Sequence, residues 1–484
     1  MKIEEYLRLD GIGLGLLVKT RQVSAEEVVQ VAIDIAEQVE PKISALCWKR
    51  FEQALEEAMA LDGSDRPSGP FAGVPFAVKE LGIMVKDAPL PAGSRLLEGI
   101  PQQADSELAR RYMKTGVILM GGSKSPEFGI SVTTEPEVHG PACNPWNPDY
   151  GTGGSSGGAA ALVAAGIMPL AHASDGGGSI RIPASHCGIF GFKPTRGMVP
   201  IGPERFEGWE GLAGPHVVSR SVRDSAAMLD LTSGPLTGDF YGASHTRQTR
   251  LLEAMEKHPG RLRIARMTDH PLGLPLHPDV VAATDKASKL CADLGHEIYD
   301  APLSVDFAGI QQAMVQLVAA NLAREADEIQ RLTGRVAGPD TLEAFTWDWL
   351  QMGREISAPD YLGAVHTLHQ TARKIGQFFT QYDVILSPVC ATPPPRLGEI
   401  HAPAGNLLEF IARLGAHAPF TALFNISGGP AMSVPLHQSE DGLPIGVQFA
   451  ADQGQEARLF QLACQLDDAT AFSQRGPSLW EELA

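Results

Sequence analysis

The chain has 484 residues, of which 44% are hydrophobic and 20% charged, and its formal net charge is −18 at pH 7. This composition is typical of a soluble globular protein long enough to bury a large core. The negative charge argues against nucleic acid and anionic membranes as partners. The start of the chain, MKIEEYLRLD, is charged throughout and does not resemble a secretion signal. We therefore expect a cytoplasmic protein that is a monomer or a homodimer.

Cysteine usage and short motifs exclude several kinds of site. The six cysteines form no CxxC pair, which favours reduced thiols over a zinc site or a disulfide framework. No H-E-x-x-H, Walker A or G-x-G-x-x-G motif indicates a metallohydrolase or a nucleotide-binding protein. The longest apolar run, residues 159–171, is too short to span a membrane. We expect neither a metal nor a cofactor.

The first half of the chain predicts alternating helices and strands. A capping box formed by Ser24 and Glu27 begins a helix whose apolar residues keep helical spacing as far as Val39. Further helices are predicted over residues 52–61, 106–114 and 157–165, and strands over residues 71–78, 117–120 and 167–171. The first of these strands is apolar and is followed directly by Lys79.

The second half predicts longer helices and short buried strands. The strands are expected over residues 261–266, 384–387, 431–435 and 445–450, and the helices over residues 278–294, 305–335, 359–381 and 455–466. This alternation favours an α/β fold in which helices cover both faces of a central, mixed, twisted β-sheet. No linker or repeat divides the chain, so we expect one large domain over residues 1–484. Its parts are an N-terminal helical region (1–70), a core (71–230), a helical insert (235–380) and C-terminal strands with a helix (381–484).

The most informative stretch is residues 150–197, which contain Ser155 in GGSSGG and Ser179 in DGGGSIR. Glycine clusters let the backbone approach a ligand closely. A serine within such a cluster can serve as a nucleophile beside N–H groups that bind an oxyanion. Helix capping is the plain alternative for Ser155 and Ser156. Three glycines before Ser179 are more than an ordinary turn requires.

A serine hydrolase without a catalytic histidine needs another base, and a lysine can be one if burial removes its charge near pH 7. Lys79 suits this role because the residues before it are apolar, although an ion pair with Glu80 is the structural alternative. Residues 153–157 also match the G-x-S-x-G nucleophile elbow of α/β-hydrolases. That elbow directly follows a buried strand, whereas a loop with Pro145 and Pro148 precedes this motif.

Together these motifs resemble the amidase signature family. The similarity rests on GGSSGG and SDGGGSIRIPASHCGIFGFKPTRG, and it extends to GPFAGVPFAVKE, TTEPEVHGPACNPWNP, FTALFNISGGPAMSVPL and DGLPIGVQF. It covers roughly residues 24–466. The TTEPE, NISGGPA and SVRD segments are most similar to the 6-aminohexanoate cyclic dimer hydrolase branch of the family.

The resemblance implies a role for each of these residues. Ser179 corresponds to the nucleophile, Ser155 to a relaying serine preceded by a cis peptide bond, and Lys79 to the base. Asp175 and Arg181 correspond to residues that brace the glycine loop. The oxyanion would bind to the N–H groups of four consecutive residues: Gly176, Gly177, Gly178 and Ser179.

Two positions depart from the family pattern. Many members have a side chain at the position of Gly176, so we expect a looser loop or a roomier pocket here. In GGSKSPEF, Gly122 replaces the usual lysine, and Lys124 is a rival base whose surroundings do not match. The candidates for the substrate pocket are Ile130, Phe206, Trp209, Phe420 and Phe424, with Trp347 or Trp349 from the helical insert.

The resemblance implies a serine amidohydrolase that cleaves C–N bonds through an acyl-enzyme. The expected substrates are small linear or cyclic amides, including aminohexanoate oligomers, and aryl amides, esters and carbamates share the same carbonyl geometry. The alternatives are a binding-only homologue and the A subunit of a tRNA-dependent glutamine amidotransferase. Ile182 argues against the amidotransferase, because that branch usually has glutamine after the arginine. The intact Ser–Ser–Lys set argues against a binding-only protein.

Overall fold

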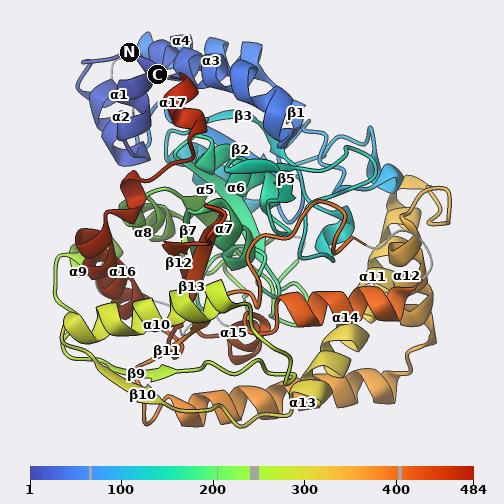
Figure 1. The fold of residues 1–484 in the computed structure, drawn as a ribbon. Coiled ribbons are helices and arrows are strands. Elements are labelled where there is room, and N and C mark those ends of the chain that lie inside the picture. The colour runs from blue at the N-terminus through green and yellow to red at the C-terminus, as the bar shows by residue number, and fades with distance from the viewer. Residues whose placement is uncertain (65–67, 204, 240–249, 402–405, 484) are drawn as a thin grey trace.

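The computed structural model describes residues 1–484 except 65–67, 204, 240–249, 402–405 and 484. Most strands belong to one eight-stranded sheet (Figure 1). Its order is β10 (Glu297–Asp300), β9 (Arg263–Arg266), β11 (Val384–Pro388), β13 (Pro444–Ala450), β12 (Ala431–Gln438), β7 (Phe190–Lys193), β8 (Gly214–Ser219) and β6 (Leu170–Asp175). The first three strands are parallel and all later neighbours are antiparallel. The predicted mixed sheet is therefore confirmed.

Two smaller sheets lie outside the large one. The first has the order β1 (Leu46–Lys49), β3 (Ile118–Ser123) and β2 (Pro75–Lys79), and the second pairs β4 (Cys143–Asn144) with β5 (Asn147–Gly151). The backbone N–H of Lys79 at the end of β2 donates to Nδ1 of His172 in β6, at 3.1 Å. This side-chain contact joins the small sheet to the edge of the large sheet.

Helices cover both faces of the large sheet. Ile264 and Leu386 pack in one apolar cluster with α10 (Pro278–Asp293) and α16 (Glu456–Thr470). Their neighbours in sequence, Ala265 and Ile385, pack in a second cluster. That cluster contains residues of α11 (Phe307–Thr333), α13 (Ala358–Phe378) and α15 (Ala422–Ser427). Because successive side chains of a strand point to opposite faces, this split places helices on both sides, as predicted.

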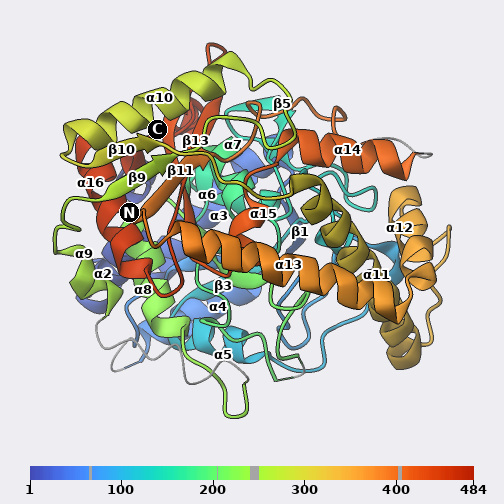
Figure 2. The same ribbon diagram turned by 90° about the horizontal axis from the view of Figure 1, so that it is seen from below.

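The remaining helices lie around this core. Those of the N-terminal region are at the top of Figure 1, whereas α11 and α12 lie at one edge and α13 crosses the view of Figure 2. They are α1 (Ile3–Arg8), α2 (Gly11–Lys19), α3 (Ala25–Ile43), α4 (Phe51–Asp62), α5 (Glu107–Lys114), α6 (Gly157–Ala164), α7 (Arg181–Cys187), α8 (Val222–Thr232), α9 (Leu251–Met255), α12 (Ala344–Glu355), α14 (Leu407–His417) and α17 (Leu479–Leu483). No helix in the described ranges is both long and apolar enough to cross a membrane.

Local sequence signals located most elements and missed some boundaries. The capping box at Ser24 and Glu27 is present and begins α3. The strand predicted over residues 167–171 is wrong in position, because the backbone at Ile167 still closes the end of α6 by donating to Leu162, and β6 begins only at Leu170. Several helices had no predicted counterpart: α7, α8, α9, α12, α14, α15 and α17.

Candidate active site

Lys79 is fully buried at the end of β2. Its Nζ donates to Ser155 Oγ at 2.7 Å and to Ser174 Oγ at 3.0 Å. Burial lowers the pKa of Lys79 to about 7, although the carboxylates of Asp175 and Glu80 act in the opposite direction. A large fraction of this amine is therefore neutral near pH 7, and it can accept a proton.

Ser155 lies in the turn before α6, and the peptide bond between Gly154 and Ser155 is cis, as the resemblance implies. The capping alternative does not apply to this residue, because the N-cap of α6 is Ser156 and its side chain makes no capping hydrogen bond. Ser155 is 3% exposed, and its hydroxyl instead faces the amine of Lys79.

Ser179 follows the three glycines after β6 and lines a cavity of about 200 Å³. The N–H of Ser156 donates to the carbonyl oxygen of Ser179 at 3.2 Å, so the two serine-bearing turns lie against each other. Among the described residues no hydrogen bond joins the hydroxyls of Ser155 and Ser179. The structure thus brings Lys79, Ser155 and Ser179 into one region.

The peptide unit between Gly177 and Gly178 is held at both ends. Thr421 Oγ1 donates to the carbonyl oxygen of Gly177 at 2.6 Å, and the N–H of Gly178 donates to Asp175 Oδ1 at 2.7 Å. The N–H of Gly178, which was expected to bind the oxyanion, is therefore already hydrogen-bonded to Asp175. Gly177 and Ser179, on either side of it, both line the cavity.

Asp175 and Arg181 form a fully buried ion pair beneath this loop. The Arg181 guanidinium donates to both Asp175 oxygens, at 2.8 and 2.9 Å. Burial alone would raise the pKa of Asp175, but the charge and hydrogen bonds of Arg181 hold it well below its ordinary value. Arg181 also donates to Thr421 O, Gln448 Oε1 and Asn425 Oδ1. The pair therefore joins the glycine loop to the C-terminal strands and α15.

We expect Arg181→Met to destabilise the fold by about 3–5 kcal/mol, because it leaves the buried carboxylate of Asp175 without its counter-ion. The measurement is the shift of the urea unfolding midpoint. Arg263→Met is the matched control, since it removes a pair with Asp383 at the surface and should cost much less. Equal losses in the two variants would contradict the bracing role of Arg181.

The absence of a side chain at Gly176 does not enlarge the substrate pocket, because Trp209 packs against this position. A Cβ built at Gly176 would lie 2.8 Å from ring atoms of Trp209. The expectation of a roomier pocket is therefore wrong, because the indole occupies the volume that a side chain at this position would take.

Gly176→Ala is expected to destabilise the protein by about 1–3 kcal/mol, because its methyl group overlaps the Trp209 ring. The backbone of Gly176 has no positive φ, so the indole is the main obstacle. The same substitution in a Trp209→Ala background should cost less, and a double-mutant cycle on unfolding midpoints measures this coupling. An equal cost in both backgrounds would assign the strain to the backbone instead.

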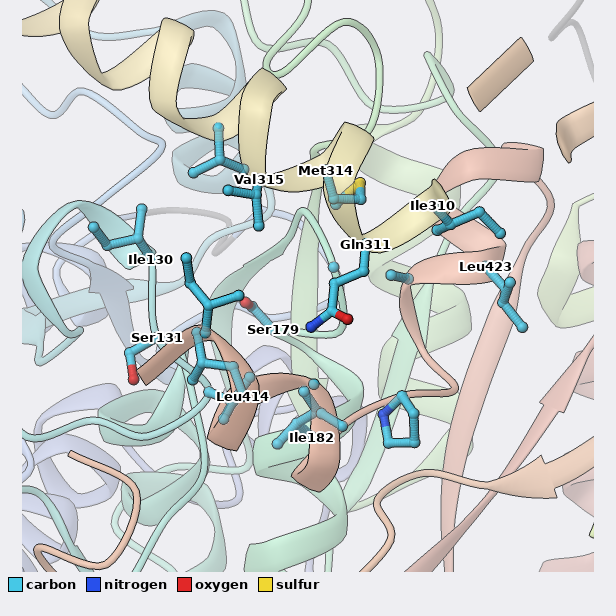
Figure 3. A pocket seen from close by; sticks show the side chains of 18 of the residues that line it. Ile130, Ser131, Ser179, Ile182, Ile310, Gln311, Met314, Val315, Leu414 and Leu423 are labelled. Carbon is cyan, nitrogen blue, oxygen red and sulfur yellow. The ribbon is translucent and has the colours of Figure 1, made fainter. Parts of the chain in front are cut away.

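The cavity above Ser179 has mostly apolar walls. Figure 3 shows Ile130, Met314 and Val315 on one side, with the amide of Gln311 extending from α11 toward Ser179. No described residue forms a hydrogen bond with the Gln311 amide. Of the predicted pocket residues, Ile130, Trp209 and Trp349 line this cavity, whereas Phe206, Phe420, Phe424 and Trp347 do not.

Contacts in the structure account for the predicted residues that do not belong to the site. Phe420 and Phe424 are completely buried, and Phe424 packs in the apolar core between the sheet and α13. Lys124, the rival base, donates to Ser44 Oγ and to the carbonyl oxygens of His139 and Gly140. Its amine is therefore committed to structural contacts away from Ser155 and Ser179.

Sequence reasoning missed several partners of the site. Ser174 receives a hydrogen bond from Lys79, and Thr421, Asn425 and Gln448 hold the glycine loop and Arg181. A signal existed for all four, since Ser174 begins the SDGGGSIR segment and the others lie in FTALFNISGG and DGLPIGVQF. Those segments indicated the family without indicating what each side chain contacts.

Comparisons with known proteins agree with this geometry. A family model described as Amidase matches residues 27–460. The 6-aminohexanoate-cyclic-dimer hydrolase of Paenarthrobacter ureafaciens is 34% identical over 475 residues, which cover 96% of this chain and 95% of that protein. A putative amidase, AmiC, of Mycobacterium leprae is 35% identical over 484 residues, with 96% of each chain covered.

Solved structures of amidases also resemble this chain. A structure of 6-aminohexanoate cyclic dimer hydrolase superimposes with a TM-score of 0.91 and 34% identity, covering 98% of this chain and 99% of that one. A bacterial aryl acylamidase of the amidase signature family superimposes with a TM-score of 0.87 and 25% identity, covering 99% and 98%. The chain therefore belongs to the amidase family and is a hydrolase of carbon–nitrogen bonds in amides.

Proposed function

We propose that this amidase is a serine amidohydrolase that works through an acyl-enzyme, with Ser179 as nucleophile, Ser155 as proton relay and Lys79 as base. The observation that carries the proposal is the buried Lys79 amine, 2.7 Å from Ser155 Oγ and with a pKa of about 7. A neutral amine at this distance can receive the Ser155 proton along the existing hydrogen bond.

In the proposed reaction, Ser179 Oγ attacks the substrate carbonyl carbon while its proton passes to Ser155 and the Ser155 proton passes to Lys79. The hydroxyl of Ser179 turns toward Ser155 for this transfer. Collapse of the tetrahedral intermediate returns the proton to the leaving nitrogen and forms the acyl-enzyme. The same relay then takes a proton from water, and hydrolysis releases the acid and restores Ser179.

The oxyanion is assigned to the N–H groups of Gly177 and Ser179, with Gly176 completing the loop. Both residues line the cavity, whereas the N–H of Gly178 is held by Asp175. Because Thr421 and Asp175 already fix the peptide unit between the two donors, the loop needs little reorganisation when charge develops on the oxygen.

The proposed substrates are small linear or cyclic amides. The apolar walls from Ile130, Ile310 and Met314 suit an alkyl chain or an aryl ring, and the Gln311 amide can hydrogen-bond a second polar group of the substrate. The similarity to 6-aminohexanoate-cyclic-dimer hydrolase supports a cyclic amide, and the aryl acylamidase structure supports an aryl amide. Esters and carbamates present the same carbonyl to Ser179.

The test uses the purified chain alone on a panel of 6-aminohexanoate cyclic dimer, p-nitroacetanilide, butyramide and glutamine. We expect turnover of the first two substrates above the last two. Mass spectrometry of the quenched reaction should find an acyl group on the peptide that contains Ser179. Turnover without a covalent adduct on that peptide, under conditions in which hydrolysis of an adduct would be rate-limiting, would contradict the acyl-enzyme.

The panel also separates the alternatives. An amidotransferase of the tRNA-dependent type would release ammonia from glutamine only together with its partner proteins, and a binding-only homologue would turn over nothing. A solved glutamyl-tRNA(Gln) amidotransferase structure from Thermotoga maritima has a TM-score of 0.74 and 24% identity to this chain, and it shows the shared fold alone. Hydrolysis of an alkyl or aryl amide by the isolated chain would exclude both alternatives.

A further inference from the structure

Three potential metal ligands meet in a buried cluster outside the serine–lysine site: His186, Cys390 and His417. Their ligand atoms all lie within 4.8 Å of one another. They come from three elements, since His186 belongs to α7, Cys390 follows β11 and His417 ends α14. The three residues are 1%, 4% and 5% exposed, so the cluster lies in the interior of the protein.

The cluster contains ring nitrogens that the surrounding protein does not satisfy. Both ring nitrogens of His186 and Nε2 of His417 have no hydrogen-bond partner in the described part of the chain. A buried polar atom without a partner is destabilising, because it has lost its hydrogen bonds to water. The two imidazoles meet edge to face, with centroids 5.1 Å apart.

The orientation of His417 leaves one nitrogen ready to bind an ion. Its Nδ1 lies 2.8 Å from Thr392 Oγ1, and that hydroxyl already donates to the carbonyl oxygen of Pro393. The hydroxyl therefore accepts from Nδ1–H of His417, which places the lone pair on Nε2. Metal-binding histidines commonly have their other nitrogen fixed in this way.

We propose that His186, Cys390 and His417 bind one thiophilic metal ion, Zn²⁺ or Cu⁺. Two imidazoles and one thiolate form a donor set that both ions accept. Cu⁺ with one thiolate gives a neutral three-coordinate site, whereas Zn²⁺ needs a fourth ligand such as water. Bond lengths of about 2.0–2.3 Å would place the donor atoms roughly 3.3–3.8 Å apart, so side chains that now span up to 4.8 Å need only move inward.

The two histidines are already in the protonation state that metal binding requires, whereas Cys390 has to lose its proton. Burial lowers the pKa of His417 to about 4 and that of His186 well below its ordinary value, so both imidazoles are neutral. Burial raises the pKa of the Cys390 thiol. Binding therefore forms a metal–sulfur bond and releases the Sγ proton to solvent, about one proton per ion.

The position of the cluster gives the ion a consequence for the amidase site. Ile182 on α7 lies one helical turn before His186 and lines the substrate cavity. Leu414 and Gly415 on α14, three and two residues before His417, line the same cavity. A bound ion would tie the helix that follows Ser179 to the cavity wall formed by α14. We expect loss of the ion to raise KM more than it lowers kcat.

The test titrates the metal-free chain with Co²⁺, as a spectroscopic substitute for Zn²⁺, and separately with Cu⁺ without oxygen against a competing chelator. We expect one ion per chain in at least one arm, with thiolate-to-cobalt charge-transfer absorption if the site takes the divalent ion. Cys390→Ser should lose binding. Cys291→Ser, which alters a buried cysteine of α10, is the matched control and should keep it.

A second variant keeps the test valid if the Cys390→Ser protein does not fold. Thr392→Val removes only the hydroxyl that accepts from His417 and should weaken binding about 10- to 100-fold. Failure of the wild type to bind either ion at a 1:1 ratio would overturn the proposal, as would unchanged binding by a folded Cys390→Ser variant. These readouts measure metal directly, so they remain informative whether or not the proposed acyl-enzyme is correct.

Discussion

Replacing Ser179 by alanine is expected to lower kcat for amide hydrolysis by about four to six orders of magnitude, with little change in substrate binding. The reason is that the variant has no atom that can form the acyl bond, while the cavity walls and the N–H groups at 177 and 179 remain. The measurement is kcat and KM for the best substrate of the panel, together with mass spectrometry for the acyl adduct.

Ser131→Ala is the matched control for this prediction. Ser131 lines the same cavity, but its hydroxyl contacts Thr133 instead of the relay. We expect its kcat to stay within about tenfold of the wild type. If Ser179→Ala retained activity within a hundredfold of the wild type, the nucleophile would have to be another group of the site.

Replacing Lys79 by methionine is expected to lower kcat/KM at pH 7 by about two to four orders of magnitude, the usual contribution of a general base. Methionine fills a similar volume but cannot accept a proton. Because burial lowers the pKa of Lys79 to about 7, the wild-type kcat/KM should fall about tenfold per pH unit below that value and level off above it.

The pH profile distinguishes a catalytic loss from a structural one. The inflection near pH 7 should be absent from any residual activity of Lys79→Met. Lys124→Met serves as control, since Lys124 is buried but donates to Ser44 and backbone carbonyls, and its profile should keep the wild-type inflection. An unchanged inflection in Lys79→Met would assign the titration to another group.

Short-range signals in the sequence predicted much of this protein for a simple reason. Helix caps, apolar periodicity and glycine clusters act over a few residues, so the start of α3 and the glycine-bedded serines can be read locally. The apolar strand before Lys79 likewise predicted burial of its amine, and the structure confirms that burial.

Contacts between distant segments could not be read in this way. The spacing of residues does not reveal that the Trp209 ring fills the space beside Gly176. Nor does it reveal that Arg181 donates hydrogen bonds to Thr421, Asn425 and Gln448. Each of these contacts depends on how separate elements pack. The same applies to Phe424, whose aromatic type suits a pocket equally well as a core. Only its place between the sheet and α13 decided that it belongs to the core.

The amino-acid sequence was enough to predict the α/β fold class, the amidase family and the three residues to which the chemistry is assigned. Those features depend on local patterns and on motif identity. The packing of the folded chain was needed to learn which N–H groups remain for an oxyanion and which side chains line the cavity. It was also needed to find that His186, Cys390 and His417 meet. Burial and hydrogen-bond competition act through space, so residues as far apart in the sequence as Arg181 and Gln448 meet only after the chain has folded.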